Sequence, residues 1–309
     1  MKKIKIVVAG IGGVGGYFGG KLAKHFRHSD KVEVHFIVRG EHLKEIKNNG
    51  LRVIEQKGDF VAVPRSATDN AAEVGVADYI IVCTKSYDLE NMLLQLKPCI
   101  NSDTIILPLL NGVDSRDRIK AMLPHNPVLE GCVYIVSRIA QPGVVENTGN
   151  IQKLYFGADD VENSRQVLLE KMLTEAGIEA TRSPDILQVL WEKYIFISPT
   201  ATATSFFNSS IGALVANDEQ LKTTTALIEE VKLLAKAKQI FIPGDITERT
   251  INKLRSLPSD ATSSMHRDFR EGKYANELES LAGFVVRMSE AHNIDTPVYK
   301  QMYEQLKTR

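Results

Sequence analysis

Lys193 is the residue whose surroundings most clearly suggest chemistry. Helical spacing is expected for residues 187–207, and on such a helix four apolar side chains surround this lysine, at Val189, Leu190, Phe196 and Ile197. Burial among them would remove water from the ammonium group and lower its pKa, which would make Lys193 a better proton donor near neutral pH. The alternative is a lysine whose stem covers apolar surface while its ammonium group reaches water. The pattern leaves both interpretations open.

A second polar cluster follows further along the chain. Ser263 and Ser264 could cap a helix or bind substrate oxygens. Glu277 and Glu279 could serve a site, or could lie at the exposed start of a helix, where the helix dipole favours carboxylates. Taken alone, the pattern favours the structural interpretation of this cluster.

A glycine-rich turn near the start of the chain is suited to binding a dinucleotide. A short apolar run of strand length precedes Gly10, Gly12 and Gly15, which have G-x-G-x-x-G spacing, and helical spacing follows them. In this arrangement Gly10 allows a sharp turn, Gly12 lets the backbone approach a pyrophosphate, and Gly15 lets the helix pack closely on the strand. The N–H groups at the helix start attract phosphates. The predicted cofactor-binding turn comprises Gly10, Ile11, Gly12, Gly13, Val14 and Gly15.

The end of the second predicted strand, residues 32–38, carries Arg39. An NAD site usually has an acidic residue here to hold the ribose 2′-hydroxyl, but this sequence has no acid before Glu41. A guanidinium group instead suits a 2′-phosphate, through bidentate and charge-assisted hydrogen bonds. We therefore expect NADPH/NADP+ rather than NADH as cofactor. The alternative is an arginine that is simply exposed to solvent.

Two more polar residues follow predicted strands. Residues 77–84 and 104–110 have the apolar character of buried parallel strands, and they are followed by Lys85 and Asn111. Ligands bind at the carboxyl ends of strands in open α/β sheets, so we expect both residues at the ligand site. For Asn111, the alternative is a plain turn, because Asn-Gly is a common turn pair.

The elements that position these residues indicate two domains. Strands alternate with helices to about residue 180, which predicts an α/β fold with an N-terminal Rossmann-type doubly wound sheet in residues 1–183. We also expect a strand over residues 128–136 and hairpins within 51–63 and 143–156. Later segments suit helices and predict an all-helical C-terminal domain, 184–309. The expected helices are residues 187–207, 221–240, 246–257 and 276–293.

Composition narrows the class of protein. The 38 basic and 38 acidic residues cancel, so a surface for nucleic acid is not indicated. Cys83, Cys99 and Cys132 are too few and too scattered for a disulfide framework or a zinc site. No run approaches the ~20 apolar residues of a membrane span, and the start lacks a signal-peptide pattern. We expect a cytoplasmic protein that acts on a small molecule; the pattern leaves open whether it is a monomer or a homodimer.

Together these features resemble the ketopantoate reductase (2-dehydropantoate 2-reductase) family over nearly the whole chain. The resemblance implies a Rossmann-type domain and a helical domain with the active site between them. It also implies NADPH-dependent reduction of 2-dehydropantoate to (R)-pantoate, in pantothenate and hence coenzyme A biosynthesis. The matching segments are Gly10–Gly15, Thr84-Lys85, Asn111-Gly112, Leu190-Trp191-Glu192-Lys193, Ser263-Ser264-Met265 and Asn276-Glu277.

The resemblance also implies roles for individual residues. Lys193 is similar to the family's general acid, which protonates the developing alkoxide. Glu277 is similar to the carboxylate near the substrate hydroxyl and the nicotinamide ribose, and Asn111 to the residue that bridges cofactor and substrate. Further implied contacts are Lys85 and Arg39 to the cofactor and Ser264 to the substrate carboxylate.

The sequence departs from the family pattern at several polar positions. Ile197, Ala201 and Ala261 stand where the family often has asparagine, and the common Glu-x-Asp-x-x-Asn-Gly motif reads ELESLAG from Glu277. Loss of hydrogen-bonding groups should relax or change the discrimination between substrates. Two alternatives therefore remain, a paralogous reductase of another 2-keto acid and a non-catalytic NADPH-binding regulatory protein.

Overall fold

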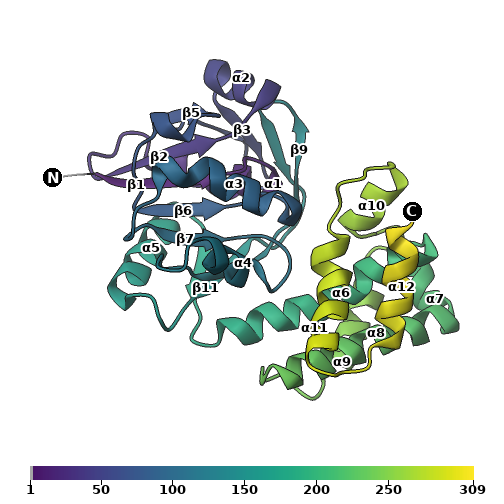
Figure 1. Ribbon diagram of the computed structural model, residues 1–309. Coiled ribbons are helices and arrows are strands. Elements are labelled where there is room, and N and C mark those ends of the chain that lie inside the picture. The colour runs from purple at the N-terminus through teal and green to yellow at the C-terminus, as the bar shows by residue number, and fades with distance from the viewer. Residues whose placement is uncertain (1–2) are drawn as a thin grey trace. The chain divides into compact units, whose positions relative to one another are not determined.

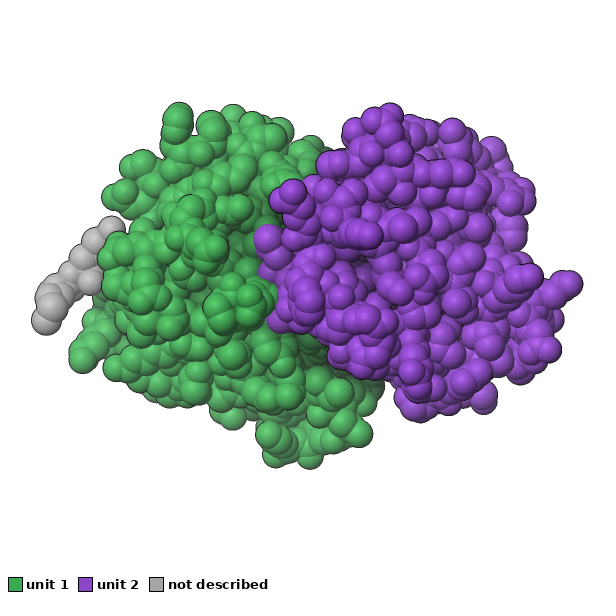
Figure 2. Space-filling view, turned by 90° about the horizontal axis from the view of Figure 1, so that it is seen from below, with its two compact units in different colours: residues 1–110, 115–186 green, residues 111–114, 187–309 purple. Residues whose placement is uncertain are grey.

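The computed structural model describes residues 3–309, which fold into two compact units (Figures 1 and 2). The sequence predicts one domain boundary, after residue 183. In the structure the chain passes to the second unit three residues later, and a short segment earlier in the chain also belongs to that helical unit. The first unit contains the chain to Leu110 and Ser115–Ile186; the second contains Asn111–Asp114 and Leu187–Arg309.

The first unit is built around a sheet of five parallel strands in the order β5-β2-β1-β6-β7. Because β1 lies at the centre and the chain crosses over toward both edges, this is the Rossmann-type doubly wound order, as predicted. The register places Val8 of β1 between Phe36 and Ile81 on its two neighbours. The strands are β1 (Ile4–Ala9), β2 (Val32–Ile37), β5 (Ser66–Thr68), β6 (Tyr79–Val82) and β7 (Ile105–Pro108).

Both faces of this sheet are buried. In β1, Ile6 and Val8 belong to one core, whereas Val7 and Ala9 belong to the core on the other face. Strands buried on both faces are apolar throughout, which is why short apolar runs predicted them. Helices α1 (Gly13–His25), α2 (Gly40–Asn49) and α5 (Asn163–Glu175) contribute to the first core, and α3 (Leu89–Leu96) and α4 (Ser115–Met122) to the second (Figure 1).

Two smaller sheets complete the first unit. The predicted hairpin within residues 51–63 is confirmed, because β3 (Leu51–Ile54) pairs antiparallel with β4 (Phe60–Ala62). These strands share a sheet with β9 (Ser137–Gln141) and β10 (Val144–Asn147). The third sheet contains β8 (Glu130–Tyr134), β11 (Lys153–Gly157) and β12 (Glu179–Arg182).

The hairpin predicted within residues 143–156 is wrong. Strand β10 pairs with β9 and β3, whereas β11 pairs with β8 and β12 in a different sheet. Gly143, at φ +77°, lies in the turn between β9 and β10. The Pro142-Gly143 turn signal therefore closes a hairpin that begins before the segment in which we expected one.

Helix α1 packs against both the main sheet and the four-stranded sheet, which accounts for its run of glycines. A Cβ atom at Gly15 would lie 2.1 Å from the carbonyl oxygen of Gly10. A Cβ atom at Gly13 would lie 2.3 Å from the carbonyl oxygen of Ser137 in β9. Only glycine permits such close approach of the helix to both neighbours.

The second unit contains helices joined by loops and no strand among its described residues, which confirms the predicted all-helical domain (Figure 1). Its core is formed around Trp191, Tyr194 and Tyr299, which are all almost fully buried. Residues 276–293 form a shorter α-helix than expected, because Glu279–Gly283 is a π-helical turn. The helices are α6 (Ile186–Phe207), α7 (Ile211–Ala216), α8 (Asp218–Ala237), α9 (Ile246–Ser256), α10 (Ser264–Arg270), α11 (Phe284–Ala291) and α12 (Pro297–Lys307).

Helix α12 lies outside the expected helices, and it begins at Pro297. Proline fits the first turn of a helix, where its missing N–H is not needed. The carboxylate of Glu230 on α8 accepts the next two N–H groups, from Val298 and Tyr299, each at 2.9 Å. Among residues 3–309, no helix combines the length and the apolar character that a bilayer-spanning segment requires.

Candidate active site

The glycine turn has the geometry expected of a phosphate-binding loop. Gly10 has φ +89°, and its N–H donates to the carbonyl of Ile37 at 3.0 Å, which fixes the turn after β1. A Cβ atom at Gly12 would meet no atom within 4 Å, so open space borders the turn at this position. Gly12 is also the N-cap residue of α1, and without a side chain it cannot cap the N–H groups of the first turn. This arrangement fits the pyrophosphate of a dinucleotide.

Arg39 and Lys85 follow the two strands that flank β1, at the same edge of the sheet as the glycine turn. The Arg39 side chain is 76% exposed, and its Nη2 lies 3.5 Å from Oδ2 of Asp88. An exposed pair of this kind contributes little stability, so the guanidinium can exchange Asp88 for an anionic ligand at small cost. Lys85 is exposed and precedes a short 3-10 turn, Ser86–Asp88.

His42 on α2 is a residue of this edge that sequence reasoning missed. Its Nδ1 accepts the backbone N–H of Gly143 at 2.8 Å, which leaves the proton on Nε2. That nitrogen is buried and faces the backbone of Ile11 in the glycine turn. Burial lowers the pKa of His42, although the Ile11 backbone opposes the shift. No local pattern signals this residue, because Gly143 is 101 residues away in the sequence.

Lys193 and Asn111 are in direct contact within the helical unit. Lys193 Nζ donates a hydrogen bond to Asn111 Oδ1 at 3.0 Å. Lys193 is half-buried on α6, and Asn111 begins the segment 111–114 that belongs to the same unit. A neutral amide oxygen fixes the position of the ammonium group without neutralising its charge. The contact therefore fixes the position of Lys193 Nζ.

Glu192, next to Lys193, has a structural role. Its Oε1 accepts a hydrogen bond from Gln188 at 2.8 Å, and its Oε2 pairs with Arg249 of α9 at 3.2 Å. These contacts tie α6 to α9. The two neighbouring charged residues on α6 thus differ in their contacts, because Glu192 binds another helix whereas Lys193 contacts the Asn111 segment.

Glu277 lies close to the same region. It is 2% exposed and precedes the π-helical turn, whose Ser280 donates to the Glu277 carbonyl at 3.1 Å. Tyr194, the residue after Lys193, donates to the carbonyl of Ser280 at 3.1 Å. A Cβ atom at Gly112, the residue after Asn111, would lie 3.7 Å from Cβ of Ser280. The π-helical turn therefore gathers the segments that carry Lys193, Asn111 and Glu277, as such turns often do at functional sites.

The serine pair divides its roles. Ser263 caps α10, because its Oγ accepts the N–H of His266 at 3.0 Å, and it also contacts Thr204 Oγ1 at 2.8 Å. Ser264 is half-buried in the first turn of α10. Thr204 stands about three turns further along α6 than Lys193. Ser263 therefore joins the start of α10 to α6, about three turns from Lys193.

Comparison with known proteins shows the family to which the chain belongs. The family model described as Ketopantoate reductase PanE/ApbA matches residues 6–160, and the model of the C-terminal part of that family matches residues 185–309. The chain belongs to the ketopantoate reductase family. The protein is therefore an oxidoreductase of this family, as the motifs indicated.

Several relatives extend the comparison. The crystal structure of a 2-dehydropantoate 2-reductase from Porphyromonas gingivalis is 39% identical, covers 99% of both chains and has a TM-score of 0.86. An uncharacterized oxidoreductase of Bacillus subtilis is 28% identical and covers 98% of both chains. A D-mandelate dehydrogenase, solved with NADH and anilino(oxo)acetate, is 23% identical, covers 99% and 98% of the two chains and has a TM-score of 0.85, which shows a shared fold.

Two of the positions at which this chain departs from the family pattern lie on α6 and carry apolar side chains. Ile197 is half-buried one turn after Lys193, and Ala201 is 3% exposed. The nearby Thr200 donates its hydroxyl proton within its own helix, to the Phe196 carbonyl 2.6 Å away, and can only accept from a ligand. Thr204 likewise donates to the Thr200 carbonyl at 2.7 Å.

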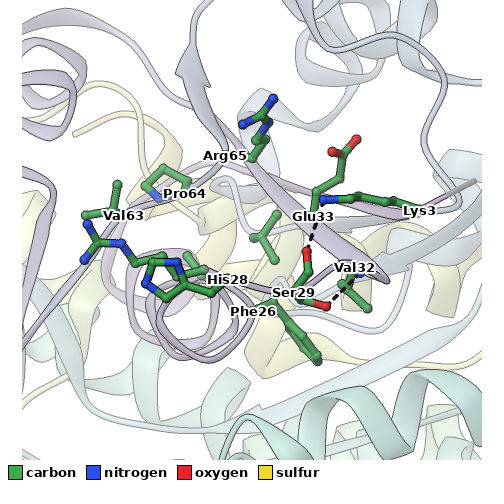
Figure 3. A pocket seen from close by; sticks show the side chains of 12 residues that line it. Lys3, Phe26, His28, Ser29, Val32, Glu33, Val63, Pro64 and Arg65 are labelled. Carbon is green, nitrogen blue, oxygen red and sulfur yellow. Dashed lines mark hydrogen bonds between the residues drawn. The ribbon is translucent and has the colours of Figure 1, made fainter.

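A separate cavity of about 210 Å³ lies at the end of the main sheet opposite to the glycine turn. Figure 3 shows the side chains that line it. It is bordered by the residues that follow α1, the start of β2 and the residues before β5. None of its lining residues in the described chain is one of the predicted site residues. The labelled side chains are Lys3, Phe26, His28, Ser29, Val32, Glu33, Val63, Pro64 and Arg65.

Proposed function

We propose that this protein reduces 2-dehydropantoate to (R)-pantoate with NADPH, and so contributes to pantothenate and coenzyme A biosynthesis. The observation that carries the proposal is the 3.0 Å hydrogen bond from Lys193 Nζ to Asn111 Oδ1, with the Glu277 segment nearby. A fixed cation stabilises negative charge that develops on an oxygen, and it can also supply a proton. Membership of the ketopantoate reductase family supports the same reaction.

Several residues of the first unit would hold the cofactor. The open space beside Gly12 and the uncapped N–H groups of α1 suit its pyrophosphate. Arg39 would bind the 2′-phosphate in exchange for Asp88, and this predicts NADPH over NADH. Lys85, at the end of β6, would contact the phosphates or the ribose from the neighbouring strand.

The remaining chemistry comes from the side chains of the helical unit. Bound NADPH supplies the hydride that adds to the ketone carbon. As negative charge develops on the ketone oxygen, Lys193 Nζ stabilises it and donates a proton to it, which completes the alcohol. Asn111 keeps the ammonium group oriented through its amide oxygen. Glu277 would accept a hydrogen bond from the substrate hydroxyl or the ribose, and Ser264 would donate to the substrate carboxylate.

A second candidate is a reductase of another 2-keto acid. Ile197 and Ala201 offer no hydrogen bond, and Thr200 binds its own helix, so this stretch of α6 is less polar than the family pattern. A site that lacks such groups should discriminate weakly in favour of a hydroxylated substrate. The fold also serves a D-mandelate dehydrogenase solved with anilino(oxo)acetate.

The two candidates are separated by a substrate panel. NADPH oxidation would be followed with 2-dehydropantoate and with 2-keto acids that carry linear, branched and aromatic side chains. The proposed function predicts the highest kcat/KM for 2-dehydropantoate. A clear preference for another acid would favour the second candidate, and turnover of none of them would contradict both.

A further inference from the structure

His42 connects three segments at the edge of the main sheet where the glycine turn lies. It is in the first turn of α2, and its Nδ1 accepts the N–H of Gly143, in the turn between β9 and β10, at 2.8 Å. A ring nitrogen that accepts a hydrogen bond carries no proton, so the proton of the neutral ring is on Nε2. His42 therefore offers one N–H donor on the side of its ring away from Gly143.

The donor at Nε2 is buried, and within residues 3–309 no group completes a hydrogen bond with it. The Ile11 backbone acts on the ring from the glycine turn, where it raises the pKa of His42 against the lowering caused by burial. A carbonyl has this effect, because it accepts a hydrogen bond from the protonated ring, whereas an N–H has the opposite effect. The group that faces the buried donor is therefore the Ile11 carbonyl.

The Ile11 carbonyl and the Gly12 N–H belong to one peptide group. Because a trans peptide is planar, its carbonyl and its N–H point in opposite directions. Holding the carbonyl toward His42 therefore directs the Gly12 N–H away from the ring. In the described chain this N–H donates to no other group, and a Cβ atom at Gly12 would meet open space. Glycine has a wide range of backbone conformations, so the orientation of this peptide needs a partner that fixes it.

We propose that His42 is a positioning residue of the dinucleotide site, whose Nε2–H donates to the Ile11 carbonyl as the cofactor binds and so aims the Gly12 N–H at the pyrophosphate. This inference rests on the proposed binding of NADPH at the glycine turn. His42 does not touch the cofactor in this role. Its hydrogen bond also polarises the peptide, which makes the Gly12 N–H a stronger donor to a phosphate oxygen.

The proposal gives the start of α2 two tasks in cofactor binding. Arg39, the N-cap residue of α2, is the proposed partner of the 2′-phosphate, and His42 follows it by three residues. One short helix would then place a direct contact at the 2′-phosphate and an indirect one behind the pyrophosphate. The two tasks can be separated, because adenosine 2′-phosphate carries the first group and lacks the second.

Two amide substitutions distinguish the two nitrogens of the ring. His42→Asn retains an oxygen near the place of Nδ1, which can accept the Gly143 N–H, but it loses the donor to Ile11. His42→Gln retains an N–H donor near the place of Nε2, but it leaves the buried Gly143 N–H without its acceptor. Each variant therefore keeps one contact of the ring and removes the other.

The measurements are Kd for NADPH, by calorimetric titration into the full chain, and Tm without ligand. His42→Asn should weaken NADPH binding by about threefold to tenfold and leave Tm nearly unchanged. His42→Gln should bind NADPH within about twofold of wild type, although its Tm should fall by roughly 2–4 °C. If His42 only stabilised the fold, NADPH binding would follow Tm, and His42→Gln would be the weaker binder.

The controls test whether the effect is confined to the glycine turn. His125→Asn changes an exposed histidine and should alter neither Kd nor Tm. Kd for adenosine 2′-phosphate should stay within about twofold of wild type in both His42 variants. The proposal is overturned if His42→Asn binds NADPH as tightly as wild type, if both variants weaken NADPH equally, or if adenosine 2′-phosphate loses the same factor as NADPH.

The same titrations separate this inference from the proposed function. If the expected pattern is found but no 2-keto acid is reduced, the positioning role stands and the proposed reductase function fails. If wild type binds and oxidises NADPH but the two His42 variants do not differ, only the positioning role fails. A wild-type chain that binds no NADPH would overturn both.

Discussion

Lys193 Nζ donates a hydrogen bond to Asn111 Oδ1, at 3.0 Å and across 82 positions of the sequence. The contact lies within the helical unit, because the segment that begins at Asn111 belongs to that unit and not to the sheet it follows. It also settles how Lys193 is placed. The sequence pattern left open whether Lys193 is buried or reaches water. In the structure its side chain is half-buried and has an amide partner, so it lies between these two environments.

Asn111→Ala removes the partner that orients this cation. We expect kcat to fall by about tenfold to a hundredfold, because a hydrogen bond to a charged group contributes roughly 1.5–3 kcal/mol. The measurement is steady-state kinetics with NADPH and the best keto acid of the substrate panel. Asn252→Ala, at an exposed position of α9, is the control. An unchanged kcat for Asn111→Ala would show that the contact has no part in catalysis.

Arg39→Ala tests the cofactor preference. Loss of the guanidinium should raise KM for NADPH by roughly tenfold to a hundredfold, because a charge-assisted contact with the 2′-phosphate disappears. KM for NADH should change by less than about threefold, since NADH lacks that phosphate. Arg52→Ala removes another exposed arginine with a carboxylate partner, Asp59, and serves as control. Equal effects on both cofactors would contradict the proposed role of Arg39.

Gly12→Ala should weaken cofactor binding, whereas Gly15→Ala should destabilise the fold. A methyl group at Gly12 meets no atom within 4 Å, so the chain should fold with a nearly unchanged Tm but bind the dinucleotide weakly. A methyl group at Gly15 would lie 2.1 Å from the Gly10 carbonyl oxygen, and relieving that overlap should lower the free energy of unfolding by about 1–3 kcal/mol or more. Thermal unfolding and cofactor titration of both variants distinguish these outcomes. Similar behaviour of the two variants would contradict this description of the turn.

Acid should destabilise the protein through its buried histidines. His266 is 3% exposed, and its ring nitrogens contact Thr262 Oγ1 at 2.5 Å and Asn208 Oδ1 at 2.8 Å. Burial lowers its pKa, and Arg270 and Arg267 push the pKa in the same direction. The unfolded chain therefore takes up a proton more readily than the folded one. The stability that neutral His266 provides is present above pH ~6.5 and is lost as the pH falls below that value.

The corresponding measurement is Tm between pH 7 and pH 5, for wild type and for His266→Gln. We expect the wild-type Tm to decrease across this range and the variant to show a smaller decrease. Part of the slope should remain, because burial also lowers the pKa of His35 and of His42. A steeper decrease in the variant would contradict the neutral, buried state of His266.

The sequence predicted those features that depend on near neighbours in the chain. The strands of the main sheet are apolar because they are buried on both faces, as Ile6, Val7 and Val8 illustrate. The glycine turn requires φ +89° at Gly10 and close packing at Gly15, and these demands leave a short local signature. Lys193 could be singled out because its helical neighbours are apolar.

Features that depend on contacts between distant segments could not be predicted. The partner of Lys193 is 82 residues away, and the contact of His42 with Gly143 depends on a sheet whose pairing the local pattern did not reveal. Helix α12 starts at a proline and is held by Glu230 of another helix, so its own sequence did not predict it. Such residues have ordinary neighbours, and only the fold gives them their partners.

The most direct test of the proposed chemistry is kcat of Lys193→Gln, measured with saturating NADPH and keto acid beside wild type and the control Lys236→Gln, at an exposed position of α8. If Lys193 donates the proton to the reduced oxygen, kcat should fall by at least about a hundredfold, while NADPH binding and the control stay unchanged. A kcat within about threefold of wild type would contradict the role of Lys193 as the general acid.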